Sequence, residues 1–87
     1  FNDAFCNLVE MKIWSVPITE HTANSVRYSL VYIVRNERVI GYDNERGKGD
    51  HKHIGGKQER YQFMDVDKLV DDFARDVEAY IRSNYES

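Results

Sequence analysis

The chain has 87 residues, 41% of them hydrophobic, and a formal net charge of −3 at pH 7. This length is enough for one small core, so we treat residues 1–87 as a single domain. The weak negative charge argues against a wholly basic nucleic-acid binder. The only cysteine, Cys6, cannot form an internal disulfide, which fits a reducing compartment. No apolar run approaches the roughly 20 residues that span a bilayer, and we therefore expect a cytoplasmic protein with no membrane segment.

The first half of the chain predicts three strands. Apolar and charged side chains alternate from Cys6 to Val16, which predicts a strand with one face in water. The segment Val26–Val34 is apolar on one face and mixed on the other, so we expect a central strand that is partly covered on both sides. A tight turn follows, in which Asn36 is expected to take a left-handed conformation. The turn joins this strand, as a hairpin, to a third strand over Arg38–Asp43.

The second half predicts a glycine-rich loop, a short strand and a helix. The loop covers Tyr42–Gly56 and the strand covers Glu59–Phe63. Apolar residues then recur every three or four positions, which predicts a helix over about Asp65–Asn84, capped by Asp65 or Asp67. The predicted fold class is therefore α+β, a small four-stranded, largely antiparallel sheet with one C-terminal helix packed on a face.

The two sides of the predicted helix differ in chemistry. Phe73 lies in the apolar stripe and is expected at the centre of the helix–sheet contact, facing Tyr28 and Leu30. The opposite side is acidic. It is either solvated or a contact for a protein partner, and a free edge of the sheet is the alternative place for that contact. The acidic residues in question are Asp71, Asp72, Asp76 and Glu78.

The predicted loop, "YDNERGKGDHKHIGG", concentrates proton carriers and cations between glycines. Histidine transfers protons near neutral pH and a carboxylate can orient it, so the candidate catalytic residues are His51, His53, Asp43 and Asp50. Cationic side chains can bind a phosphate, and the candidates for this role are Arg27, Arg46, Lys48 and Lys52. The alternative is that the glycines only turn the chain and the charged residues are solvated.

The loop does not indicate a cofactor. It lacks the G-x-x-x-x-G-K-[ST] pattern of a phosphate-binding P-loop. On an extended segment His51 and His53 would share a face and could bind a metal together with Asp50 or Asp43. Lys52 lies between the two histidines, however, and no third strong ligand is suitably spaced. We therefore expect neither a metal nor a cofactor.

The same residues resemble a known family. The loop, the "YQF" that follows it and the segment "LVDDFARDVEAYI" are similar to the TumE family, over Arg27–Ile81. The most specific part of the resemblance is the series Arg27, Tyr28, Tyr42, Asp43, Asn44, Gly47, Lys48, Gly49, Asp50, His51, His53 and Gly55. The resemblance implies the toxin component of a bacterial or archaeal type II toxin–antitoxin system, neutralised by a helix-turn-helix antitoxin. It implies no settled mechanism, so the residue roles above come from their chemistry alone.

Two classes of function are compatible with these residues. One is a metal-independent ribonuclease, in which a base activates a ribose 2′-hydroxyl, an acid protonates the leaving oxygen and cations hold the phosphate. The other is a non-catalytic module that binds a nucleic acid or a protein and acts by occlusion. Two ionisable groups of the loop within hydrogen-bond reach of each other would favour catalysis. A homodimer is compatible with the small core and an exposed sheet edge.

Overall fold

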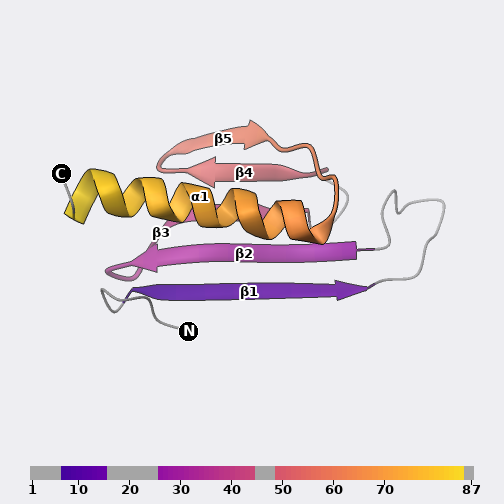
Figure 1. The fold of residues 1–87 in the computed structure, drawn as a ribbon, viewed down its shortest axis with the longest axis horizontal. Coiled ribbons are helices and arrows are strands. Elements are labelled where there is room, and N and C mark those ends of the chain that lie inside the picture. Colours follow the sequence, from indigo (N-terminus) through magenta and orange to yellow (C-terminus); the bar gives the residue numbers. More distant parts are fainter. Residues whose placement is uncertain (1–6, 16–25, 45–48, 86–87) are drawn as a thin grey trace.

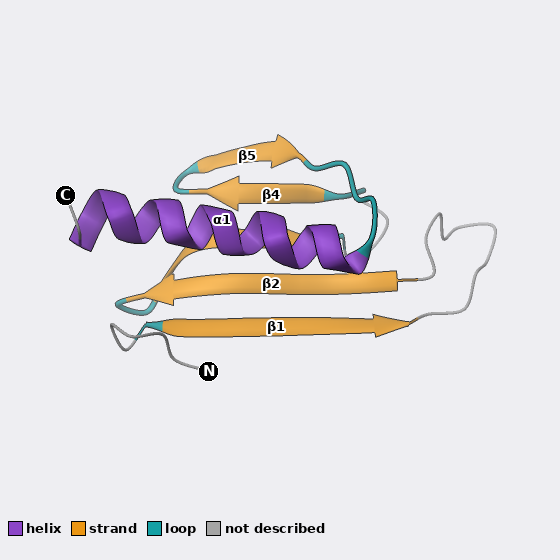
Figure 2. Ribbon diagram, viewed as in Figure 1, coloured by secondary structure: helices purple, strands orange, loops and turns teal. Residues whose placement is uncertain are grey.

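The computed structural model describes residues 7–15, 26–44 and 49–85, and these form one sheet and one helix. The five antiparallel strands follow one another across the sheet in chain order, and α1 crosses one face of it (Figure 1, Figure 2). The elements are β1 (Leu8–Ser15), β2 (Val26–Val34), β3 (Glu37–Asp43), β4 (His51–Ile54), β5 (Lys57–Arg60) and α1 (Val66–Tyr85). Two candidate phosphate ligands, Arg46 and Lys48, lie outside the described residues, as does Cys6.

The α+β class and the helix on one face are confirmed, but the described sheet has five strands where four were expected. β4 lies inside the segment predicted as a loop, and the strand predicted over Glu59–Phe63 instead covers Lys57–Arg60. The reason is that β4 and β5, with the sequences HKHI and KQER, are almost entirely polar, so no apolar alternation marks them. They form because their backbones extend the ladder that begins at β3.

Two tight turns set the register of the hairpins. Arg35 and Asn36, between β2 and β3, have φ angles of 53° and 65°, which confirms the left-handed Asn36 and is typical of a type I′ turn. Gly55, between β4 and β5, has a φ angle of 62°, and its N–H donates to the Val39 carbonyl at 2.9 Å. The register matters because a slip of one residue would turn every side chain of a strand to the other face.

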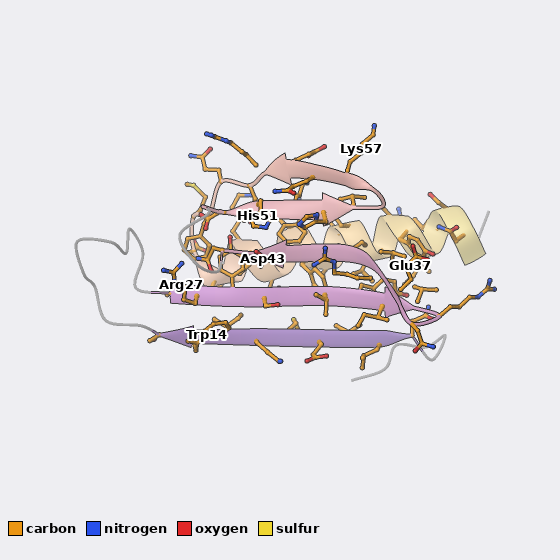
Figure 3. All side chains as sticks on the ribbon, turned by 180° about the vertical axis from the view of Figure 1, so that it is seen from behind. Trp14, Arg27, Glu37, Asp43, His51 and Lys57 are labelled. Carbon is orange, nitrogen blue, oxygen red and sulfur yellow. The ribbon has the colours of Figure 1, made fainter. Side chains whose placement is uncertain are left out.

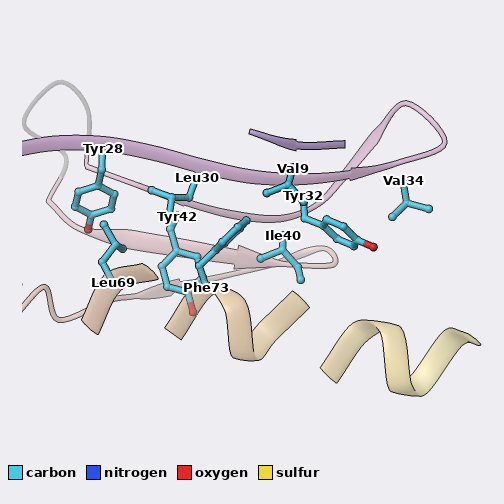
Figure 4. Close-up of a cluster of buried hydrophobic side chains, with 9 residues drawn as sticks. All are labelled: Val9, Tyr28, Leu30, Tyr32, Val34, Ile40, Tyr42, Leu69 and Phe73. Carbon is cyan, nitrogen blue, oxygen red and sulfur yellow. The ribbon is translucent and has the colours of Figure 1, made fainter. Parts of the chain in front are cut away.

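The sheet face under α1 holds the hydrophobic core. Tyr28, Leu30 and Tyr32 alternate along β2 and are fully buried, as the strand pattern predicted. α1 contacts β3, and the Phe73 ring lies edge-on to the Tyr42 ring at 5.9 Å (Figure 4). Phe73 is therefore part of the core, as expected, although its aromatic partner is Tyr42 rather than Tyr28. The buried apolar residues are Val9, Tyr28, Leu30, Tyr32, Val34, Ile40, Tyr42, Leu69 and Phe73.

The helix begins where the sequence predicted. Asp65 precedes α1, and its Oδ1 accepts a hydrogen bond from the Lys68 N–H at 2.7 Å, so Asp65 is the N-cap. Asp67 lies in the first turn, where its negative charge suits the helix dipole. Because residues four apart share one side of a helix, this start aligns Leu69 and Phe73 above the sheet. Within the described residues, no helix combines the length and the apolar character needed to cross a membrane.

The acidic side of α1 is not one solvated surface. Asp72 accepts a hydrogen bond from the Tyr61 hydroxyl at 2.6 Å, and Asp76 accepts one from the Tyr42 hydroxyl. These two carboxylates contact side chains of the sheet and of the segment that leads into α1, so the expectation that they lie on the outer side of the helix is wrong. The acidic residues of that expected surface that are exposed are Asp71 and Glu78.

Candidate active site

The sheet face away from α1, the open face, carries a row of mostly charged side chains. The row contains one ladder partner from each strand, namely Lys12, Ser29, Asp43, His51 and Arg60. Directly opposed residues of antiparallel strands share a face, with Cβ atoms about 5 Å apart. Tyr42 and Lys52, the neighbouring pair in the ladder, contact α1, so Asp43 and His51 point away from it (Figure 3).

Three side chains of the open face contact one another and form the histidine cluster, which is defined as Asp43, His51 and His53. His51 Nε2 lies 2.9 Å from Asp43 Oδ1, and the two side chains are only 12% and 23% exposed. His51 Nδ1 lies 3.3 Å from the Gly49 carbonyl oxygen. The His53 ring stands edge-on to the His51 ring, with the centroids 5.2 Å apart. Two ionisable groups of the predicted site are thus within hydrogen-bond reach.

The surroundings of His53 favour its neutral form. Burial lowers the pKa of His53, and the positive charge of Arg38 and the neighbouring His51 lower it further, against an opposing effect of Asp43. A Cβ added to Gly41 would lie 3.1 Å from Arg38 Cδ, so the Arg38 side chain occupies the space that this glycine leaves open. Gly41 is the ladder partner of His53, which places Arg38 beside the histidine cluster.

Arg38 lies beside the candidate site and was not among the residues predicted from the sequence. β2 and β3 pair with a register shift between Tyr32 and Ile33, after which Arg38 lies opposite Ile33 on the open face. A bulge of this kind changes the face of the sheet on which a residue lies, and no apolar pattern in the strand predicts the bulge. The signal that could have found Arg38 is Gly41, because a glycine inside a strand commonly marks the close approach of another group.

β4 turns two other candidate residues away from the histidine cluster. Lys52 lies under α1, where it pairs with Asp76 at 3.8 Å and sits 5.7 Å from the centroid of the Tyr42 ring. Asp50 lies near Tyr28 on the same side. Burial, and then the Asp50 charge, raise the pKa of the Tyr28 phenol, although its hydroxyl has no partner with hydrogen-bond geometry among the described atoms. The alternation of the strand thus divides the predicted loop residues between the two faces.

Arg27 is anchored at the end of the sheet next to Asp43. Its Nη1 donates to the Asn44 carbonyl oxygen at 2.5 Å. Asn44 is buried, and its side chain accepts a hydrogen bond from the Tyr28 N–H and donates one to the Val26 carbonyl, both at 3.0 Å. These bonds join β2 to the residue that follows Asp43 and so hold the end of β3. Asn44 belongs to the series that resembles the family, but no role was predicted for it from the sequence.

A hollow of about 640 Å³ opens next to His51. It is lined by Gly49, Asp50, His51, Gln58, Glu59, Arg60 and Tyr61. Small-molecule sites typically measure roughly 300–1,000 Å³. The hollow, which Asp43 and His53 do not line, is therefore large enough for a group the size of a nucleotide next to His51.

The histidine cluster is also the group of described residues that could hold a metal ion. One ligand atom from each of Asp43, His51 and His53 lies within 4.8 Å of the other two. The sequence analysis found no suitably spaced third ligand, whereas the ladder supplies Asp43 from β3. The cluster thus has the chemistry both for proton transfer and for metal coordination.

The fold and the site together define a small α+β protein with a histidine–carboxylate pair on the open face of its sheet. The family model described as Toxin TumE matches residues 2–81. The chain therefore belongs to the TumE toxin family, as the resemblance indicated, and membership of a toxin family implies an antitoxin as partner. Neither the curated proteins nor the solved structures contain a match to the chain.

Proposed function

We propose that this toxin cleaves RNA by proton transfer at the histidine cluster, without a metal ion. The observation that carries the proposal is the contact between His51 Nε2 and Asp43 Oδ1 at 2.9 Å, with the His53 ring beside it. A carboxylate that accepts a hydrogen bond from one imidazole nitrogen orients the ring for proton transfer. Two histidines in different environments can divide the roles of base and acid between them.

The lowered pKa of His53 makes it the base in this scheme. Neutral His53 accepts the proton of a ribose 2′-hydroxyl, whose oxygen forms a bond to the adjacent phosphorus. The bond between that phosphorus and the 5′-oxygen breaks, and His51 donates a proton to the departing oxygen. The products are a 2′,3′-cyclic phosphate and a free 5′-hydroxyl. A positioned acid or base contributes typically about 10²–10⁴-fold to the rate.

The open face offers cations and an aromatic ring for binding RNA. Arg60 is the ladder partner of His51, and Arg38 lies beside His53. Arg27 is held by one of its N–H groups and has others to donate to a phosphate. Trp14, the ladder partner of Arg27, is 40% exposed and can stack on a base. The proposed phosphate ligands also include two residues outside the described ranges, Arg46 and Lys48.

Cleavage of labelled cellular RNA by the purified protein, in the presence of a chelator, tests this function. The wild type should produce fragments that end in a 2′,3′-cyclic phosphate. His51→Ala and His53→Ala should each lower the cleavage rate by about 10²–10⁴-fold. Lys52→Ala changes the residue between them, on the other face, and should retain cleavage. If the wild type binds RNA and leaves it intact, the alternative function holds, in which the toxin acts by occlusion.

We also propose that the antitoxin is a helix-turn-helix protein and that it binds on the β1 side of the domain. β1 is an edge strand of the described sheet, and its Met11 and Ile13 side chains are 43% and 39% exposed. A hollow of about 260 Å³ with an almost wholly apolar lining lies between β1 and α1. An edge strand beside an apolar groove suits a partner that adds a strand or lays a helix in the groove. An RNA target and a DNA-binding antitoxin would both place the toxin in the cytoplasm.

Co-purification with the antitoxin tests this surface. Met11→Asp should weaken the complex, whereas Met64→Asp, at a position that is 60% exposed and precedes α1, is the matched control. Asp71→Lys tests the acidic side of α1, the other surface considered from the sequence. Loss of the complex in Asp71→Lys alone would move the contact to that side. Light scattering of the isolated toxin would show whether the β1 edge serves a homodimer instead.

A further inference from the structure

The side chains of the histidine cluster can close around one cation. One ligand atom from each of the three residues lies within 4.8 Å of the others. Two atoms that are each about 2.1 Å from a metal can be at most about 4.2 Å apart, so small side-chain rotations would let them share an ion. The ladder maintains the arrangement, because Asp43 is the partner of His51 and Gly41 is the partner of His53.

Both ring nitrogens of His51 face oxygen acceptors. A neutral imidazole has a single N–H donor. When Nδ1 donates to the Gly49 carbonyl oxygen at 3.3 Å, the lone pair of Nε2 faces Asp43 Oδ1 at 2.9 Å. In the other tautomer Nε2 donates to Asp43, and Nδ1 has no proton for the Gly49 carbonyl oxygen. A metal ion between Nε2 and Oδ1 would leave the proton on Nδ1 and so satisfy both nitrogens. A metal-bound histidine is commonly oriented by donating its other ring N–H to a carboxylate, a backbone carbonyl or a water.

We propose that Asp43, His51 and His53 bind one Zn²⁺ ion, or a similar first-row divalent ion, and that the bound ion inhibits the toxin. Two imidazoles and a carboxylate form a zinc site of three protein ligands, in which a fourth position stays open. Mg²⁺ and Ca²⁺ prefer sites built from oxygen ligands and should bind poorly. The inhibition rests on the proposed function, because the ion occupies the nitrogen lone pairs that would otherwise carry protons.

The positive charge of Arg38 should oppose binding of the ion. Removing it should therefore raise the affinity, whereas removing a ligand should lower it. Its side chain lies against Gly41, and its positive charge acts on His53. A cation in the cluster is repelled by the same charge. Arg38→Ala should therefore bind Zn²⁺ more tightly than the wild type does. Lys12→Ala, which removes a positive charge from the far strand of the same face, is the control and should change the affinity much less.

Titration of the purified full chain with Zn²⁺, followed by calorimetry and by NMR of the histidine side chains, tests the site. We expect one ion per chain and shifts of the His51 and His53 ring signals. Asp43→Asn and His53→Gln should each raise the dissociation constant at least about 10-fold. His21→Gln, which removes the remaining histidine of the sequence, should leave it unchanged. Unchanged affinity in the ligand variants, or equal binding of Mg²⁺, would overturn the proposal.

The inhibitory half of the proposal has its own readout. RNA cleavage by metal-free protein in a buffer without chelator should fall as Zn²⁺ is added, with half-inhibition near the dissociation constant measured without RNA. If Zn²⁺ binds at the cluster and cleavage is unaffected or increases, inhibition is wrong while the site stands. If no RNA is cleaved under any condition, the proposed function fails, and the binding result still decides the metal site.

Discussion

The polar side chains on the two faces of β4 make different kinds of contact. Lys52 points under α1, where it pairs with Asp76 at 3.8 Å. Its neighbours His51 and His53 point to the open face, where His51 meets Asp43 at 2.9 Å. One short polar strand therefore supplies both an ion pair that joins the sheet to the helix and the histidine pair of the candidate site.

The position of a residue in the ladder, rather than its type, thus decides whether its charge pairs with α1 or lies in the candidate site. The ion pair of Lys52 lies against the ring of Tyr42, whose hydroxyl also donates a hydrogen bond to Asp76, so it strengthens the contact between the layers. On the open face, His51 lines a hollow of about 640 Å³. A proton carrier must lie within reach of its substrate, and α1 does not cover the open face.

The largest expected effect is on the free energy of unfolding and comes from removing a side chain that packs α1 on the sheet. Phe73 is 3% exposed, and Phe73→Ala should cost about 3–5 kcal/mol. Small domains are stabilised by only roughly 5–15 kcal/mol, so much of the stability should be lost in urea unfolding. Met64→Ala, at a 60% exposed position, is the control and should stay within about 0.5 kcal/mol. A wild-type unfolding curve for Phe73→Ala would mean that this ring does not hold the layers together.

Replacing each of two neighbouring β4 residues by glutamine should separate the roles of the faces. His51→Gln should lower RNA cleavage by about 10²–10⁴-fold, because the proton carrier is gone. Lys52→Gln should leave cleavage near the wild-type rate and lower stability by about 1 kcal/mol or less, since partly exposed ion pairs contribute little. Cleavage rates and melting curves of the two variants check this. The opposite pattern would exchange the assignments of the two faces.

A turn variant tests how firmly the register keeps the two faces distinct. Gly55 has a φ angle of 62°, a conformation that costs about 1–2 kcal/mol for a residue with a Cβ. Gly55→Ala should therefore destabilise the β4–β5 hairpin by about 1 kcal/mol. Gly56→Ala is the matched control, because a Cβ meets open space at both positions and Gly56 lacks the positive φ angle of Gly55. Faster amide exchange in β4 and β5 of Gly55→Ala alone is the expected result, and equal exchange in both variants would contradict it.

The smallest expected effect is on the pH dependence of the free energy of unfolding, through Asp72 of α1. Hydrogen bonds from Lys68 and then from Tyr61 lower the pKa of Asp72. A carboxyl group with a lowered folded-state pKa stabilises the fold above its unfolded pKa, and this contribution is lost as the pH falls through the folded value. The free energy of unfolding should thus decline more steeply towards acid in the wild type than in Asp72→Asn. Parallel curves for the two proteins would show that Asp72 is not the group responsible.

The sequence by itself determined the elements that have an internal pattern. Alternation along Val26–Val34 identified the buried face of β2, and the repeat of three and four residues identified α1 with Phe73 in the core. Asn36 identified the turn, because asparagine is one of the few residue types that readily adopt the left-handed conformation found there. All these signals are local, so they can be recognised before the strands pair. The series of residues that resembles the TumE family is likewise a feature of the sequence alone, and the family model confirms it.

Only the tertiary structure decided which charged residues meet. β4 and β5 carry no apolar alternation, and a polar strand takes its conformation from backbone hydrogen bonds to a partner strand. Pairing with β3 places Asp43 beside His51 and turns Lys52 towards α1, and a register shift brings Arg38 to the same face as His53. No pattern within the loop sequence encodes these pairings, because they depend on strands that lie elsewhere in the chain.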